Sequence, residues 1–286
     1  MISTLDVSPT VLHFNNVKSN FTRVALSFYH MKKPIKKAKP TVSTQPATDT
    51  SPRVHQREKI DYVLNLRGLD WTEKQKAFIE LATHKDTKIV FLSGPAGTSK
   101  SILAVYCSLL LLNQKRVSDI VYVRTIIESA STSMGTLPGD ADQKLQFFTS
   151  VLNDKLEELL PAGDVKKLHF DERVKGMPVN YLRGASYNAK AVIIDEAQNG
   201  TFNELLTCLT RIGKFTKYFV LGDPMQTDLK HKETSGFVPM FGIFNSEQAQ
   251  AQGIYCLEFG KEDIMRSEIL KFIIEQIENY KAQNTK

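Results

Sequence analysis

The chain has 286 residues, of which 42% are hydrophobic and 24% charged, and its formal net charge is +6. This composition excludes a wholly disordered chain and allows a sizeable core, while the longest apolar run, residues 102–112, is too short to cross a membrane as a helix. Cys107, Cys208 and Cys256 are far apart and lack metal-ligand spacing, so we expect reduced thiols in a cytoplasmic protein with no membrane partner.

The basic charge is concentrated in residues 1–60, which hold ten Lys or Arg against three Asp or Glu. For residues 1–30 the alternatives are an organelle presequence, a marginal helix or an artefactual extension, since Met31 directly precedes a Lys-rich run at 32–37. That run is typical of a basic tail that contacts phosphates or of a solvated leader. Because residues 39–52 are mostly small and polar, we expect a linker there and a largely disordered extension over 1–60.

The folded domain is expected over residues 61–286. A helix is predicted at 71–82 with Thr72 as its cap. The other predicted elements are a strand at 88–92, a helix at 102–112, a strand at 120–123, a helix at 142–160, a strand at 191–194, a helix at 201–212, strands at 217–221 and 254–259, and a helix at 267–280. A strand, helix and strand at this spacing form a βαβ unit, which predicts an α/β fold with a mostly parallel sheet and helices on both faces.

A phosphate-binding loop is predicted between the first strand and the helix that follows it. The segment is close to the pattern G-x-x-x-x-G-K-[ST], in which backbone N–H groups, a helix N-terminus and a lysine ammonium favour an anion. The sixth position is Ser99 instead of glycine, and its Cβ could crowd the phosphate. The alternative is a Gly-Pro turn that simply leads into a buried helix. The residues expected to bind the nucleotide are Gly94, Pro95, Ala96, Gly97, Thr98, Ser99, Lys100 and Ser101.

Two later apolar strands also end in acidic residues, Asp195-Glu196 after 191–194 and Asp223 after 217–221. If the three strands are parallel neighbours, these carboxylates meet the phosphate-binding loop at one edge of the sheet. Lys100 would then bind β- and γ-phosphate oxygens, Ser101 and Asp195 would hold Mg²⁺ directly or through water, and Glu196 would polarise the attacking water. The alternative for Asp195-Glu196 is a helix N-cap.

Seven sequence blocks occur in a recognisable order over about residues 70–270. They are Gly94 to Ser101, Arg124-Thr125 with Glu128, Leu137-Pro138-Gly139-Asp140 with Lys144, Arg183-Gly184, residues 193–199, residues 209–213 and residues 222–228. This succession resembles the PhoH-like family of P-loop ATPases, which is similar to the core of superfamily 1 helicases.

The resemblance implies ATP hydrolysis by a RecA-like core that forms homo-oligomers, with a hexameric ring as one form, and acts with RNA or single-stranded DNA. It implies that Gln75 contacts the adenine edge, the alternative being a solvated helix position. It also implies that Asp223 and Gln226 sense the γ-phosphate. Arg211 and Arg266 are candidates for stabilising transition-state charge, in the same chain or across a subunit interface, and a surface ion pair is the alternative for Arg266.

Some positions depart from the family pattern or leave alternatives open. Ser99 replaces a glycine, and Gly200 stands where the family more often has threonine. Arg124 and Arg183 would contact phosphate, or else form structural ion pairs with Glu128 or Asp140. The leading function is an ATPase that acts with nucleic acid. The alternatives are a nucleotide-binding switch or scaffold with weak hydrolysis, and a kinase, against which the water-activating glutamate argues.

Overall fold

A computed structural model of the chain describes residues 57–125, 141–182, 187–227, 229, 235–265 and 268–284. The chain divides into two units, Met1–Pro52 and Arg53–Lys286, and the described residues belong to the second. The predictions for residues 1–56, for Arg183 and for Arg266 therefore lie outside the described residues. Among the described residues, Ile60 is the first along the chain whose side chain is buried.

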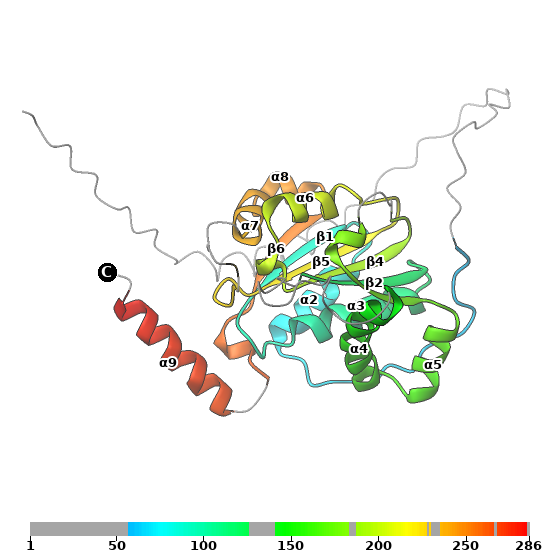
Figure 1. Ribbon diagram of the computed structural model, residues 1–286, viewed down its shortest axis with the longest axis horizontal. Coiled ribbons are helices and arrows are strands. Elements are labelled where there is room, and N and C mark those ends of the chain that lie inside the picture. The colour runs from blue at the N-terminus through cyan, green and yellow to red at the C-terminus, as the bar shows by residue number, and fades with distance from the viewer. Residues whose placement is uncertain are drawn as a thin grey trace, which may run out of the picture. The chain divides into compact units, whose positions relative to one another are not determined.

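Six strands of the described residues form one sheet in which every neighbouring pair is parallel (Figure 1). They are β1 (Ile89–Ser93), β2 (Asp119–Arg124), β3 (Val174–Pro178), β4 (Lys190–Asp195), β5 (Lys217–Gly222) and β6 (Ile254–Glu258). Their order across the sheet is β3-β2-β4-β5-β1-β6. Every residue of β1 and β5 is buried, as expected for central strands covered on both faces. The predicted α/β fold with a mostly parallel sheet is confirmed.

Helices cover both faces of the sheet, with α2, α3 and α4 on one face and α6 and α7 on the other (Figure 1). The helices are α2 (Glu73–Thr83), α3 (Lys100–Asn113), α4 (Ala141–Leu159), α5 (Ala162–Phe170), α6 (Phe202–Leu209), α7 (Phe237–Phe244), α8 (Glu247–Ala251) and α9 (Glu268–Asn284). Short 3₁₀ turns are η2 (Val179–Leu182), η3 (Ala197–Asn199) and η5 (Lys261–Asp263). None of the described helices combines the length and apolar character needed to span a bilayer.

Side-chain caps fix the start of two of these helices. Thr72 caps α2, because its hydroxyl accepts a hydrogen bond from the Gln75 N–H at 3.3 Å while its own N–H donates to Gln75 Oε1 at 3.0 Å. Thr201 and Glu204 form the same reciprocal arrangement at α6. Thr72 therefore has the capping role that the sequence predicts for it.

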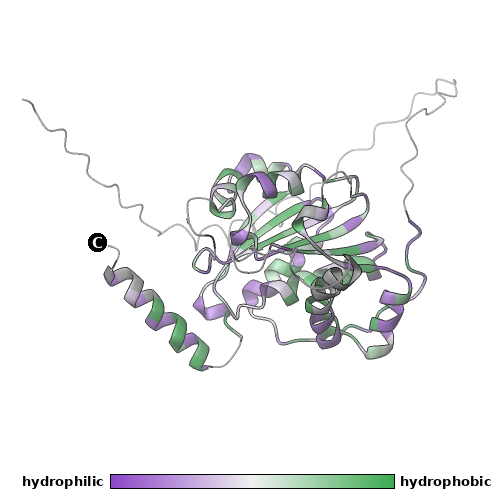
Figure 2. Cartoon of the chain, in the orientation of Figure 1, coloured by the Kyte–Doolittle hydropathy of each residue, from purple (hydrophilic) through white to green (hydrophobic). Residues whose placement is uncertain are grey.

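Besides the 3₁₀ turns, one strand and three α-helices of the described residues were not predicted: β3, α5, α7 and α8. β3 reads Val-Lys-Gly-Met-Pro and α7 contains both a proline and a glycine, so their composition argues against regular structure. β3 is an edge strand, where a proline is tolerated. The predicted apolar face of α9 exists as a stripe in Figure 2, and its members are exposed in the single chain: Ile269, Phe272, Ile273 and Ile277.

The core between the sheet and α6 and α7 holds the strands in register. Phe91 of β1, Ile194 of β4 and Val220 of β5 belong to one buried cluster, which also contains Phe237 of α7. Because β5 pairs with both β1 and β4, the carboxyl ends of these three strands lie side by side. The fold therefore brings the loops that follow them to one edge of the sheet.

Gly176 of β3 lies close against the backbone of helix α4. A Cβ at this position would be 2.5 Å from the backbone carbonyl carbon of Phe148 in α4. We expect Gly176→Ala to lower the free energy of unfolding by about 1–3 kcal/mol, because the helix backbone must shift to relieve the overlap. Chemical denaturation measures the change. Gly163→Ala is the matched control, since nothing lies within 4 Å of its Cβ, and equal loss in both variants would contradict the account.

Candidate functional site

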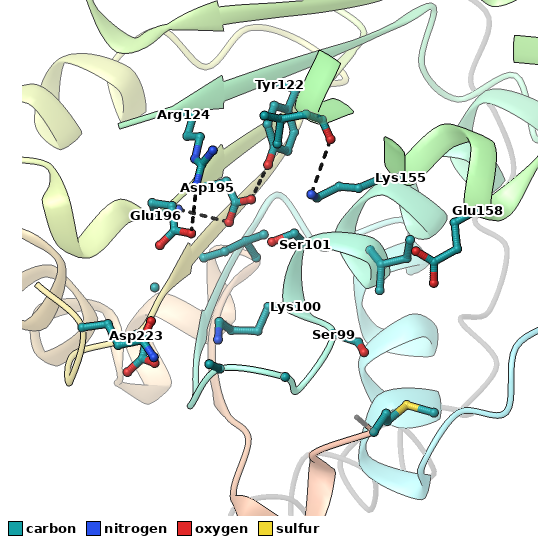
Figure 3. A pocket seen from close by; sticks show the side chains of 18 of the residues that line it. Ser99, Lys100, Ser101, Tyr122, Arg124, Lys155, Glu158, Asp195, Glu196 and Asp223 are labelled. Carbon is teal, nitrogen blue, oxygen red and sulfur yellow. Dashed lines mark hydrogen bonds and ion pairs between the residues drawn. The ribbon is translucent and has the colours of Figure 1, made fainter. Parts of the chain in front are cut away.

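A cavity of about 600 Å³ opens at the carboxyl ends of β1, β4 and β5. The hypothesis that the three strands are parallel neighbours is confirmed, because β5 lies between β1 and β4. Figure 3 shows the side chains that the strands and the following loops bring to this cavity. Among them are Lys100, Ser101, Asp195, Glu196 and Asp223.

The loop between β1 and α3 folds around its own lysine. Lys100 Nζ donates hydrogen bonds to the carbonyl oxygens of Gly94 at 2.7 Å and Pro95 at 2.9 Å. Thr98 is fully buried, and its hydroxyl donates to the Pro95 carbonyl at 2.8 Å, so it shapes the loop from within. The cavity itself is lined, within this loop, by Ala96, Gly97, Ser99, Lys100 and Ser101.

Ser99, the departure from the consensus, has a left-handed backbone with φ 60° and ψ 23°. This conformation is the one that glycine adopts without strain, which is a physical reason for glycine at the consensus position. Serine holds the same conformation here, directly before the first residue of α3. Its side chain and that of Lys100 point in different directions in Figure 3.

Because the loop already has the left-handed conformation with serine, Ser99→Gly is expected to preserve it. Glycine relieves the left-handed strain of the folded state, but it also gives the unfolded chain more conformational freedom. Because these two effects oppose each other, the free energy of unfolding should change by less than about 1 kcal/mol. ATP affinity should stay within about threefold of wild type, whereas Ser99→Val, a β-branched residue at positive φ, should weaken it at least about tenfold. Isothermal titration calorimetry on both variants tests this, and loss of ATP binding in Ser99→Gly would contradict it.

Asp195, the last residue of β4, is held by groups from two strands. It is 6% exposed, its Oδ1 accepts the Glu196 N–H at 3.1 Å, and its Oδ2 accepts a hydrogen bond from the Tyr122 hydroxyl. Burial, followed by the charge of Asp195, raises the pKa of Tyr122 above its usual value, so the phenol stays protonated as a donor. Thr125, after β2, donates its hydroxyl proton to the Asp195 and Glu196 carbonyls, with a distance of 3.2 Å to the first.

Glu196 is the more accessible of the two carboxylates. Its backbone is also left-handed, with φ 56°, a conformation that is uncommon for a residue with a Cβ and that occurs often at functional sites. Gln198 Nε2 donates to Glu196 Oε2 at 2.7 Å, and Arg124 pairs with Glu196 Oε1 at 3.6 Å. The partner of Arg124 is thus Glu196, while its predicted partners, Glu128 and Asp140, lie outside the described residues.

Gln198 connects the loop after β4 with the loop after β5. It is 1% exposed, and its Oε1 accepts the Asp223 N–H at 3.0 Å while its Nε2 donates to the Gln226 carbonyl at 3.1 Å. Asp223 is buried, and its Oδ1 accepts the Met225 N–H at 2.9 Å. One amide side chain therefore fixes Glu196, Asp223 and Gln226 relative to one another.

The electrostatics of the cavity suit a bound anion together with a cation. Burial lowers the pKa of Lys100, and the carboxylates of Asp223, Asp195 and Glu196 oppose that shift. Ser101 and Asp195 offer the hard oxygen atoms that Mg²⁺ prefers. The described residues contain no cluster of three or more His, Cys, Asp or Glu side chains able to hold a metal. The pair of Ser101 and Asp195 is nevertheless sufficient for Mg²⁺. This ion usually takes one or two carboxylates and completes its shell with water and substrate phosphates.

Apolar side chains also line the cavity. They are those of Leu69, Trp71, Ile102 and Met265. The Trp71 ring lies 5.3 Å from that of Tyr106, and its buried indole N–H finds no acceptor among the described residues. A flat heterocyclic ligand could pack against these apolar side chains.

Not all predicted residues line this cavity. Gln75 is fully buried, and its Nε2 donates to the carbonyls of Thr98 at 3.2 Å and Asp263 at 3.4 Å, so its amide supports the loop. The adenine contact of Gln75 stays a prediction. Arg211 follows α6 and is not among the cavity residues of its own chain. Gln226 does line the cavity.

Sequence analysis missed three residues of the site. Tyr122 interrupts an otherwise aliphatic strand, which is a signal for a buried hydroxyl with a partner. Gln198 stands in a block that the family resemblance includes, but its bonds join segments far apart in sequence. Lys155 of α4 lines the cavity and lies 5.7 Å from the Tyr122 ring centroid, and nothing in its local sequence marks it.

Comparison with known proteins gives a consistent result. The family model described as PhoH-like protein matches residues 70–278. The chain is 31% identical over 214 residues to a PhoH-like protein of Synechocystis sp., which covers 75% of this chain and 62% of the relative. It is 32% identical over 204 residues to a PhoH-like protein of Bacillus subtilis, covering 71% and 61%. Protein PhoH of Escherichia coli is 32% identical over 182 residues, covering 63% and 50%. The chain thus spans about three fifths of the first two relatives.

Proposed function

Because the chain belongs to the PhoH-like family, we propose that this RecA-like P-loop protein binds ATP with Mg²⁺ and hydrolyses the bond to the γ-phosphate. The observation that carries the proposal is the convergence of Lys100, Asp195 with Glu196, and Asp223 on one cavity from three neighbouring strands. A half-buried lysine facing three carboxylates suits a triphosphate and a divalent cation better than either alone.

Each group has a role in this proposal. Lys100 leaves the loop carbonyls to bind β- and γ-phosphate oxygens, and Ser101 and Asp195 hold Mg²⁺. Mg²⁺, when bound, neutralises charge on the phosphate oxygens. Glu196 takes a proton from the attacking water, and Asp223 with Gln226 responds to the γ-phosphate through Gln198. The apolar lining residues, Trp71 among them, receive the base.

A second candidate function is a nucleotide switch with weak intrinsic hydrolysis. It is favoured by the contacts of Glu196, whose carboxylate is engaged by Arg124 and Gln198, because both contacts make the carboxylate a weaker base. In this version hydrolysis becomes fast only when a partner draws Arg124 away. The two candidates differ in the rate of phosphate release by the chain alone.

We further propose that RNA or single-stranded DNA is the partner and that copies of the chain assemble, with a hexameric ring as one form. Arg211 does not line the cavity of its own chain, so an arginine for the transition state would come from elsewhere, such as a neighbouring copy. The exposed apolar face of α9 offers surface for such assembly. Steady-state phosphate release with and without oligonucleotide tests the partner, and a monomeric mass by light scattering in the presence of ATP would contradict assembly.

A further inference from the structure

A second cavity, of about 700 Å³, lies at the amino ends of strands β1 and β5, whereas the nucleotide site lies at their carboxyl ends. Lys88 directly precedes β1 and Lys217 begins β5, and the two are neighbours because the Tyr218 N–H donates to the Lys88 carbonyl at 2.8 Å. The P-loop and Asp223 follow the other ends of the same two strands. We call this cavity the basic groove, after six of its lining residues: Lys85, Lys88, Lys115, Arg116, Lys214 and Lys217.

Two of these cationic side chains form hydrogen bonds to backbone carbonyl groups. Lys217 Nζ donates to the carbonyls of His84 and Thr87, and Arg116 donates to those of Thr83 and His84, the latter at 3.2 Å. These bonds satisfy carbonyl groups at the C-terminal end of α2. Lys217 and Arg116 are therefore explained by the fold without any ligand.

The other four lysines are not explained in this way. Lys85, Lys88, Lys115 and Lys214 are exposed, and none of their side-chain ammonium groups forms an ion pair or hydrogen bond with another described residue. Two acids act on this region: the exposed Asp86 opposes the lowered pKa values of Lys217 and Arg116, and Asp119 opposes that of Lys59, which also lines the groove. Burial, followed by repulsion from Arg116, lowers the pKa of Lys217 to about 7.

An aromatic side chain stands among these lysines. Phe215 lines the groove, is 70% exposed and has a left-handed backbone with φ 60°. That conformation is an outlier for a bulky residue, and burial gives no reason for it, because the ring faces solvent. Lys115 is also left-handed, with φ 54°. The two strained turns hold a lysine and a phenylalanine at the surface of the same groove.

We propose that the basic groove binds a single strand of nucleic acid, with its phosphates on the exposed lysines and one base stacked on Phe215. Clustered lysines attract phosphates, and an exposed ring offers a stacking surface that only an unpaired base can use. The inference rests on the proposed function in one respect, namely that RNA or single-stranded DNA is the partner. It adds the site, which is separated from the P-loop by the length of β1, about 17 Å for a five-residue strand.

The test measures binding of a fluorescein-labelled oligouridylate of about 12 nucleotides to the full chain by fluorescence anisotropy across a range of salt concentrations. K85E/K214E should weaken binding at least about tenfold and reduce the slope of log affinity against log salt by about two. Phe215→Ala should weaken binding about tenfold with little change in slope. The matched controls are Lys166→Glu and Phe170→Ala, exposed residues of α5, which should bind as wild type does.

Phosphate release in the absence of oligonucleotide should be the same in all four variants, which shows that the fold and the nucleotide site are intact. Unchanged oligonucleotide binding in K85E/K214E would overturn the inference and leave the proposed ATPase standing. Absence of binding by the wild-type chain would overturn both the inference and the proposed partner. A polyglutamate peptide of matched charge that competes as well as the oligonucleotide would also overturn it, because it would indicate an acidic protein as ligand.

Discussion

Replacing Glu196 by glutamine is expected to slow single-turnover ATP hydrolysis by about 10²–10⁴-fold while ATP still binds. The amide keeps the size and hydrogen-bonding capacity of the side chain but cannot take a proton from water. Its contact with Gln198 at 2.7 Å can be kept, so the loop after β4 should retain its conformation. Rapid-quench measurement of hydrolysis, with calorimetry for ATP binding, separates the two effects.

The matched control for that variant is Glu157→Gln, which changes an exposed carboxylate of α4 in the same way. It should hydrolyse ATP at the wild-type rate. If Glu196→Gln also hydrolyses ATP at the wild-type rate, Glu196 is not the general base. The general base would then have to be sought at another group that reaches the γ-phosphate.

Replacing Lys100 by alanine is expected to remove most ATP affinity. The variant leaves Asp195, Glu196 and Asp223 without the cation that they face, so the cavity repels a triphosphate. Truncating one partner of a buried charge pair costs about 2–5 kcal/mol, which corresponds to a loss of affinity of roughly 30-fold to several thousand-fold. Calorimetry with Mg²⁺ and ATP measures the change.

The folded state of Lys100→Ala needs its own check, since Lys100 also bonds to the Gly94 and Pro95 carbonyls. Thermal unfolding without nucleotide should show a shift of only a few degrees. Lys166→Ala, at an exposed position of α5, serves as the control for removal of a positive charge. Wild-type ATP affinity in Lys100→Ala would show that the loop binds nucleotide without its lysine.

Sequence patterns predicted the central sheet because β1, β4 and β5 are buried on both faces and therefore read as continuous apolar runs. The ends of those runs marked the site, since carboxyl ends of parallel strands meet at one edge. Edge strand β3 and helix α7 escaped prediction because each contains a glycine and a proline, and tertiary packing outweighs those local preferences.

The fine structure of the site depends on contacts that no local pattern records. Tyr122 and Asp195 are 73 residues apart, and only the pairing of β2 with β4 brings the hydroxyl to the carboxylate. Gln198 reaches Asp223 and Gln226 because β5 lies next to β4. Ser99 replaces the glycine of the phosphate-binding consensus, yet its backbone keeps the left-handed conformation that favours glycine at this position. The sequence alone could not show that the loop keeps this conformation.

The cavity at the ends of β1, β4 and β5 is expected to hydrolyse ATP. Phosphate release from ATP by the purified full chain, with Mg²⁺ or with excess chelator, is measured beside that of Lys100→Ala and Glu196→Gln. Release should require Mg²⁺ and fall to background in both variants. ATP binding by the wild-type chain with no phosphate release above that of the variants would contradict it.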